Sequence, residues 1–198
     1  LDAPRPVAHD ETEVRSAIAA LKPRCDVLAV QLHWGYEWSM YPMRTMRDLA
    51  RSYVDAGADI VVCHHAHVPM GVETWRHGIV AHGLGNLYFG RPPRAGHPFQ
   101  STSFLLRVGV SKSAAVRAEI IAVRTEADGN VGEATGEAAE AIHNAIGYLS
   151  SRLNGEYAEE VEEGQLGNAG CQLLLDLERR ISAADTRGVS ERIHGLAP

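Results

Sequence analysis

Four histidines form two groups that are well separated along the chain: His33 alone, and then His64, His65 and His67 together. Imidazole nitrogens bind zinc-like ions at about 2.0–2.1 Å, and two or three of them suit zinc, manganese or iron. Histidine is also the side chain whose charge changes near neutral pH. The two groups therefore predict a metal or acid–base site. The alternative is that these histidines only hydrogen-bond to backbone at the ends of strands.

The segments around these histidines have the pattern of a βαβ unit. Short apolar runs at 27–32 and 60–63 are typical of strands buried on both faces, and the apolar stripe over 43–56 indicates the helix between them. Such a crossover is right-handed and makes the two strands parallel, so their carboxyl ends meet at one edge of the sheet. Because α/β folds usually bind ligands at that edge, we expect both histidine groups to meet there.

The alternation of side chains along a strand predicts how the histidines are oriented. His33 follows the first strand, and the second strand runs into His64-His65-Ala66-His67. In an extended segment every second side chain points the same way, so His65 and His67 should face one site while His64 points away. We expect His33, His65 and His67 to share one metal ion, with His64 as a supporting or substrate-facing group.

Three other side chains near this edge are candidates for chemistry. The Glu37 carboxylate can ligate a metal, orient a histidine or act as a base, and the alternative is an exposed loop glutamate. Asn86 ends a Gly83-Leu84-Gly85-Asn86 turn that can offer an amide oxygen to a metal or a hydrogen bond to an oxyanion; the alternative is a plain tight turn. Cys63 is either an extra soft ligand or a buried strand residue.

The remaining patterns predict an α/β domain over 1–128 followed by a helical C-terminal extension over 129–198. The predicted elements are a helix over 10–22, a hairpin of 72–75 with 79–82, an antiparallel pair of 103–110 with 114–124, and helical stripes at 134–149 and 173–181. Together with the parallel strands, the hairpin makes the sheet mixed.

Composition excludes several classes of protein. The formal net charge of −6 lacks the basic footprint of a general nucleic-acid binder, so no nucleic-acid partner is expected. No apolar run reaches the roughly 18 residues that span a bilayer, and the first ten residues lack a secretory leader pattern. Three widely spaced cysteines do not form a disulfide framework. As the chain stands we expect a cytoplasmic location; a missing upstream segment would allow a membrane-associated or extracellular one.

Three segments in order resemble the CapA family of bacterial poly-γ-glutamate capsule biosynthesis proteins. They are 26–37 (DVLAVQLHWGYE), 56–68 (AGADIVVCHHAHV) and 83–86 (GLGN). The resemblance covers roughly residues 10–125 and extends to calcineurin-like metallophosphoesterases, which implies the C-terminal half of an αββα sandwich with a dinuclear metal site.

The resemblance also implies roles for individual residues: metal ligands at His33, His65 and His67, and catalytic roles at His64, Glu37 and Asn86. The implied cofactor is a divalent transition metal, manganese, zinc or iron, which is dinuclear only when the first half of the domain is present. Departures from the family pattern are Cys63 for a usual glycine, Ala66 for a usual proline, His82-Gly83 for a usual Tyr-Ser, and Leu87 for a usual phenylalanine.

The resemblance implies a metal-dependent, phosphoesterase-type hydrolase linked to synthesis or export of poly-γ-glutamate, acting on an anionic polymer or phosphoester. The contrasting hypothesis is a noncatalytic partial domain or scaffold that needs a separate N-terminal half or the capsule machinery, because the first-half ligand motifs are absent. We expect the chain alone to bind at most one ion, weakly, with little phosphoesterase activity. Its bare sheet edge favours self-association.

Overall fold

The computed structural model describes residues 10–88, 101–112, 115–126 and 128–153. Its elements are α1 (Glu11–Leu21), a 3-10 turn η1 (Lys22–Arg24), β1 (Ala29–His33), α2 (Arg44–Asp55), β2 (Ile60–His64), β3 (Val72–Trp75), β4 (Gly78–Ala81), β5 (Thr102–Val110), β6 (Ala115–Thr125), β7 (Val131–Glu133) and α3 (Gly136–Ser151). The helical stripe predicted at 173–181 lies outside the described residues, as does most of the predicted C-terminal extension.

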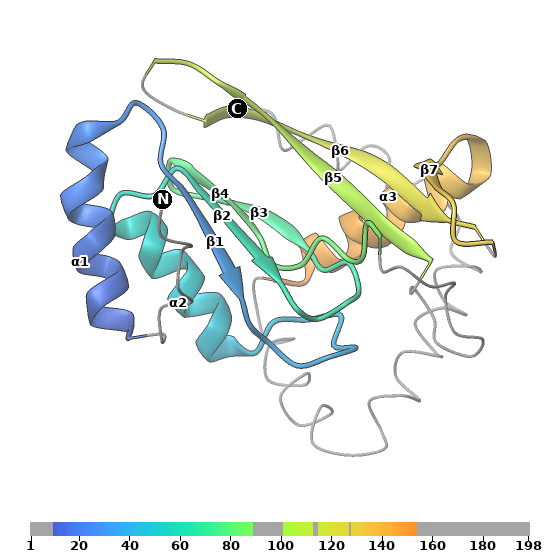
Figure 1. The fold of residues 1–198 in the computed structure, drawn as a ribbon, viewed down its shortest axis with the longest axis horizontal. Coiled ribbons are helices and arrows are strands. Elements are labelled where there is room, and N and C mark those ends of the chain that lie inside the picture. The colour runs from blue at the N-terminus through green and yellow to red at the C-terminus, as the bar shows by residue number, and fades with distance from the viewer. Residues whose placement is uncertain (1–9, 89–100, 113–114, 127, 154–198) are drawn as a thin grey trace.

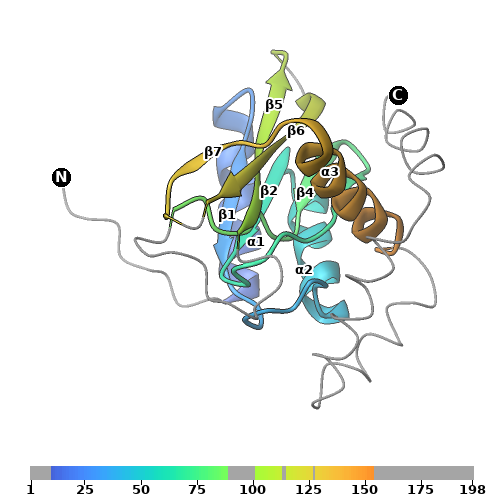
Figure 2. The same cartoon turned by 90° about the vertical axis from the view of Figure 1, so that its right-hand side faces the viewer.

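Two sheets form the centre of the fold (Figure 1). The first has the strand order β1-β2-β4-β3, with β1, β2 and β4 parallel and β3 antiparallel, and the second is the antiparallel sheet β5-β6-β7. Helix α3 packs against β3 and β6, and the turned view shows it beside β6 (Figure 2). The predicted α/β class, the mixed sheet and the second antiparallel pair are therefore confirmed.

Each face of the first sheet has its own hydrophobic core. On one face, α1 and α2 pack Ile18, Tyr53 and Val54 against Leu32 and Val61 of the strands. The opposite face of β3 and β4 packs against β5, β6 and α3 in a second core, which contains Val72, Ile79, Ala81, Phe104, Ala122, Ile142 and Ile146. The first sheet is thus packed against helices on one face and, over β3 and β4, against the second sheet and α3 on the other.

The first two helices begin and end where local chemistry requires. The Asp10 carboxylate caps α1 by accepting hydrogen bonds from the backbone N–H groups of Thr12 and Glu13 at 2.8 and 3.2 Å. After α2, Gly57 has a φ of +120°, a conformation that a residue with a Cβ adopts only with strain. These positions agree with the predicted helices over 10–22 and 43–56.

A buried carboxylate aligns the first two strands. Asp59, just before β2, accepts hydrogen bonds from the backbone N–H of Leu28 at 2.7 Å and from Nζ of Lys22 at 2.6 Å. From this anchor the two strands run in register, and their last residues, His33 and His64, are paired neighbours. The predicted meeting of the two histidine groups follows from this alignment.

Strand β1 differs from the predicted strand buried on both faces. Ala29, Gln31 and His33 are exposed, whereas Leu32 is buried against the helices. The reason is that β1 is an edge strand among the described strands, while the described part of the second sheet packs over β3 and β4. An apolar run alone does not reveal whether the second face of a strand is covered.

The segment after β6 also differs from the prediction. A short strand, β7, has no counterpart among the predicted elements, and α3 begins at Gly136 rather than at 134.

None of the helices in the described part of the chain has the length and hydrophobicity that a membrane crossing requires.

Candidate metal centre

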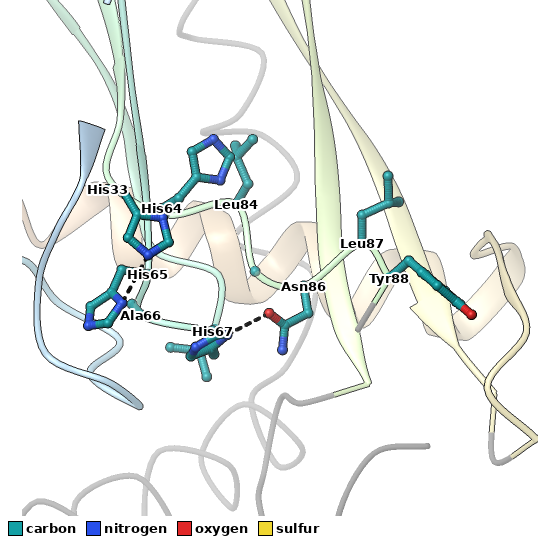
Figure 3. Close-up of a pocket in the computed structure, with 12 residues that line it drawn as sticks. His33, His64, His65, Ala66, His67, Leu84, Asn86, Leu87 and Tyr88 are labelled. Atoms are coloured by element: carbon teal, nitrogen blue, oxygen red, sulfur yellow. Dashed lines mark hydrogen bonds between the residues drawn. The ribbon is translucent and has the colours of Figure 1, made fainter. Parts of the chain in front are cut away.

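The two histidine groups meet at the carboxyl ends of β1 and β2. Nε2 of His33 lies 3.2 Å from Nδ1 of His65, and their ring centroids are 4.9 Å apart (Figure 3). Two imidazole nitrogens that bind one tetrahedral ion at about 2.0–2.1 Å lie about 3.3 Å from each other. The pair therefore has the spacing of two ligands of one ion, although a hydrogen bond between the rings produces the same distance.

A second set of donors also includes His65. Glu37, His65 and His67 each offer one ligand atom, and these atoms lie within 4.8 Å of one another. Among the described histidines, cysteines and acidic residues, this is the only group of three or more that meets that limit. His33 is hydrogen-bonded to this triad rather than part of it, so its role as a ligand stays a prediction.

The loop that carries Glu37 is attached to the loop that carries the histidines. The backbone N–H of Trp34 donates to the carbonyl of His64 at 3.1 Å, and the N–H of Trp38 donates to the carbonyl of Ala66 at 2.8 Å. The Trp38 ring also stacks on His67, with centroids 5.4 Å apart. These contacts bring the carboxylate of Glu37 to the histidines.

The backbone after β2 is not extended, which corrects the basis of one prediction. His65 has a φ of +99° and His67 a φ of +62°, so both residues lie in the left-handed region. Such conformations cost about 1–3 kcal/mol each in residues other than glycine and are concentrated at functional sites. The two side chains converge because the chain turns at both positions, not because an extended strand continues through them.

Asn86 holds the third member of the triad. Its Oδ1 lies 2.8 Å from Nδ1 of His67, so the amide oxygen accepts the imidazole N–H and the lone pair of His67 lies on Nε2. The turn before Asn86 requires Gly85, which has a φ of +78° and at which a Cβ would lie 2.9 Å from the carbonyl oxygen of Thr102. Asn86 was predicted to be catalytic, and the structure places it beside a ligand candidate.

These residues open onto a cleft of about 300 Å³. Figure 3 shows the ring of His64 on the Leu84 side of the cleft, away from His65 and His67. Burial lowers the pKa of His64, and the nearby His33 lowers it further. The exposed side chains of Leu87 and Tyr88 form the outer wall.

Cys63 is not directed toward this cleft. Its side chain is 1% exposed and packs in the core beneath α1 and α2. Burial raises the pKa of the thiol to about 12, against a smaller opposing effect of a hydrogen bond with Trp34. Of the two alternatives for Cys63, the structure shows the buried strand residue.

A buried charged network, which the sequence patterns do not predict, supports the turn that leads to Asn86. Arg51 on α2 donates from Nε and Nη2 to the two carboxylate oxygens of Glu73 at 3.0 and 2.6 Å, and Nε2 of His82 lies 2.9 Å from the same carboxylate. Burial alone would raise the pKa of Glu73, but the hydrogen bonds from His82 and Arg51 outweigh it and lower the value. Burial lowers the pKa of His82 despite the opposing carboxylate.

Residues 2–91 match the family described as bacterial capsule synthesis protein PGA_cap. Over 72 residues the chain is 42% identical to the PGA biosynthesis protein CapA of Bacillus subtilis, a match that covers 36% of this chain and 19% of that protein. Over 68 residues it is 41% identical to the capsule biosynthesis protein CapA of Bacillus anthracis, covering 34% and 16%. It is 31% identical over 113 residues to a probable polyglutamine synthesis accessory protein of Mycobacterium tuberculosis, covering 57% and 29%. The predicted resemblance is confirmed, and the chain spans less than a third of each relative's length.

Proposed function

We propose that this chain, whose residues 2–91 belong to the bacterial capsule synthesis family, contributes a metal-dependent hydrolase site to the synthesis or export of poly-γ-glutamate. One observation carries the proposal: the ligand atoms of Glu37, His65 and His67 lie within 4.8 Å of one another at the end of two parallel strands. The names of the relatives support the biological setting, and the donor set supports the chemistry.

The donor set fits a divalent transition metal. Two imidazole nitrogens and one carboxylate oxygen are the ligands that catalytic zinc sites combine, and such sites leave one position open for water or substrate. Manganese and iron accept the same donors. A bound ion would supply Lewis-acid chemistry, polarising a phosphoryl or carbonyl oxygen and lowering the pKa of water.

The surrounding residues of this chain have separate tasks in the proposal. Asn86 fixes the ring of His67 by accepting its N–H, and His33 hydrogen-bonds to His65. His64 lies on the other side of the same cleft, where it can hydrogen-bond to a substrate oxygen. The proposed substrates are a phosphoester or an anionic γ-glutamyl polymer.

The direct test is turnover of a generic nitrophenyl phosphoester with added manganese or zinc. We expect the activity of this chain to be small, to require the ion, and to disappear in His65→Ala and His67→Ala. The matched control is His77→Ala, which removes an exposed histidine from the β3–β4 turn. Turnover that survives the site substitutions, or that needs no ion, contradicts the proposal.

A second candidate is a noncatalytic module that requires a separate N-terminal half or the capsule machinery. The observation that favours it is the donor count, because two-metal hydrolysis needs a bridging carboxylate and further ligands, and the described residues supply one closed triad. Metal binding without turnover, with turnover restored by adding a separately expressed upstream segment, would support this candidate.

A further inference from the structure

Trp38 contacts the proposed metal site without offering it a ligand atom. Its ring lies against the ring of His67, with centroids 5.4 Å apart and an angle of 28° between the ring planes. It also directly follows Glu37, so one residue of the triad precedes it in sequence and another lies under its ring. Trp38 is not among the site residues predicted from the sequence.

The position of Trp38 is fixed by the backbone as well as by packing. Its N–H donates to the carbonyl of Ala66 at 2.8 Å, which ties the loop after β1 to the loop after β2. Its φ of +67° is a left-handed conformation that costs a residue with a Cβ about 1–3 kcal/mol. The side chain packs beside a buried cluster that contains Met40, Ala66 and Val68. The indole is therefore held at a defined place beside His67.

His67 is thus restrained in two directions. Asn86 restrains the edge of the imidazole by accepting a hydrogen bond from its Nδ1–H, and Trp38 restrains its face. Together the two contacts fix the orientation of the imidazole ring and therefore the direction of the Nε2 lone pair. The electron-rich face of an indole also attracts positive charge, which a metal-bound imidazole carries.

We propose that Trp38 is a positioning residue of the metal centre, which holds the His67 ring by stacking so that Nε2 and the Glu37 carboxylate reach the same ion. This inference rests on the proposed function, because it requires an ion at the triad. Trp38 acts through His67 and does not touch the ion. Its contribution should therefore appear in metal affinity and in the geometry of the bound ion rather than in the fold alone.

The experiment titrates the whole chain with Co²⁺ and records both the dissociation constant and the ligand-field absorption of the bound ion. Trp38→Leu removes the aromatic face and Trp38→Phe keeps one, while both retain a Cβ and therefore the same backbone strain. Tyr36→Leu is the matched control, since it removes an exposed aromatic ring from the same loop. A thermal melt of each variant shows that it is folded.

We expect Trp38→Leu to weaken Co²⁺ binding about tenfold, the size of effect seen when supporting partners of metal ligands are removed, and to alter the absorption bands. Trp38→Phe should bind within about threefold of wild type with unchanged bands, and Tyr36→Leu should match wild type. Equal affinity and bands in Trp38→Leu would overturn the positioning role while leaving the metal site intact. A wild-type chain that binds no Co²⁺ would overturn both the metal site and this inference.

Discussion

Nε2 of His33 lies 3.2 Å from Nδ1 of His65, although the residues are 32 positions apart in sequence. The parallel pairing of β1 with β2 produces this contact, because His33 is in register with His64 at the ends of the two strands. The chain then turns at His65, which contacts His33 and also belongs to the Glu37–His65–His67 triad. His65 and His67 are therefore common to the predicted ligand set, which includes His33, and to the triad, which includes Glu37.

Asn86 should matter for metal affinity more than for stability. Asn86→Leu removes the acceptor for the Nδ1–H of His67, so the ring is no longer held with its lone pair on Nε2. We expect zinc affinity to fall about 10- to 100-fold by isothermal titration calorimetry. Asn86→Asp, which keeps an acceptor oxygen, is the control and should bind more tightly than Asn86→Leu. Equal affinities of wild type and Asn86→Leu would show that the hydrogen bond does not support the site.

The strained backbone at His65 should be detectable in the free energy of unfolding. At a φ of +99°, alanine carries the same strain as histidine, whereas glycine does not. We expect His65→Gly to be more stable than His65→Ala by about 1 kcal/mol in urea denaturation. At His77, which has an ordinary φ, the glycine variant should be no more stable than the alanine variant. The same order at both positions would argue against strain at His65.

The buried Arg51–Glu73 pair should be costly to break. Glu73→Gln leaves Arg51, a residue only 8% exposed, without its counter-charge, and we expect a loss of about 3 kcal/mol in the free energy of unfolding. Glu119→Gln makes the same chemical change in the exposed Arg107–Glu119 pair, where a loss below about 1 kcal/mol is expected. Similar losses in the two variants would show that the buried Arg51–Glu73 pair contributes no more to stability than the exposed Arg107–Glu119 pair.

The free energy of unfolding should decrease as the pH is lowered, because His82 is buried in the folded protein. Burial lowers the pKa of His82 in the folded state, with Arg51 and Arg47 adding to the effect and Glu73 opposing it. Below the ordinary pKa of about 6.5, the unfolded chain binds a proton that the folded chain resists, so the free energy of unfolding decreases as pH falls from there toward the folded pKa. His82→Gln should lose less stability than wild type between pH 7.5 and 5.5 in urea denaturation. Parallel losses would assign the pH dependence to other groups.

The sequence predicts the parts of the fold that depend on local patterns. The helices over 10–22 and 43–56 and the hairpin of β3 with β4 are predictable because each has a signal within a few residues. The meeting of His33 with His65 was also predictable, since parallel strands of a βαβ unit must end at one edge.

The remaining features depend on contacts between distant residues, which have no periodic signal. The ion pair of Arg51 with Glu73 joins a helix to a strand 22 residues later, and the stacking of Trp38 on His67 joins two loops. The left-handed backbone at His65 and His67 cannot be predicted from the sequence, because a positive φ is uncommon for histidine and common for glycine. The sequence leaves two alternatives open for Glu37, a site residue or an exposed loop glutamate. It cannot decide between them because the contacts that hold the Glu37 loop against the histidine loop join distant residues.

The most direct test of the metal site is elemental analysis combined with zinc titration of the purified chain. We predict one ion per chain, with binding lost in His65→Ala and His67→Ala and weakened in Glu37→Gln. His33→Ala should retain the ion with reduced affinity, because His33 contacts the triad through His65. A chain that binds no divalent ion, or one that binds equally well without His65 and His67, would contradict a metal site at the triad.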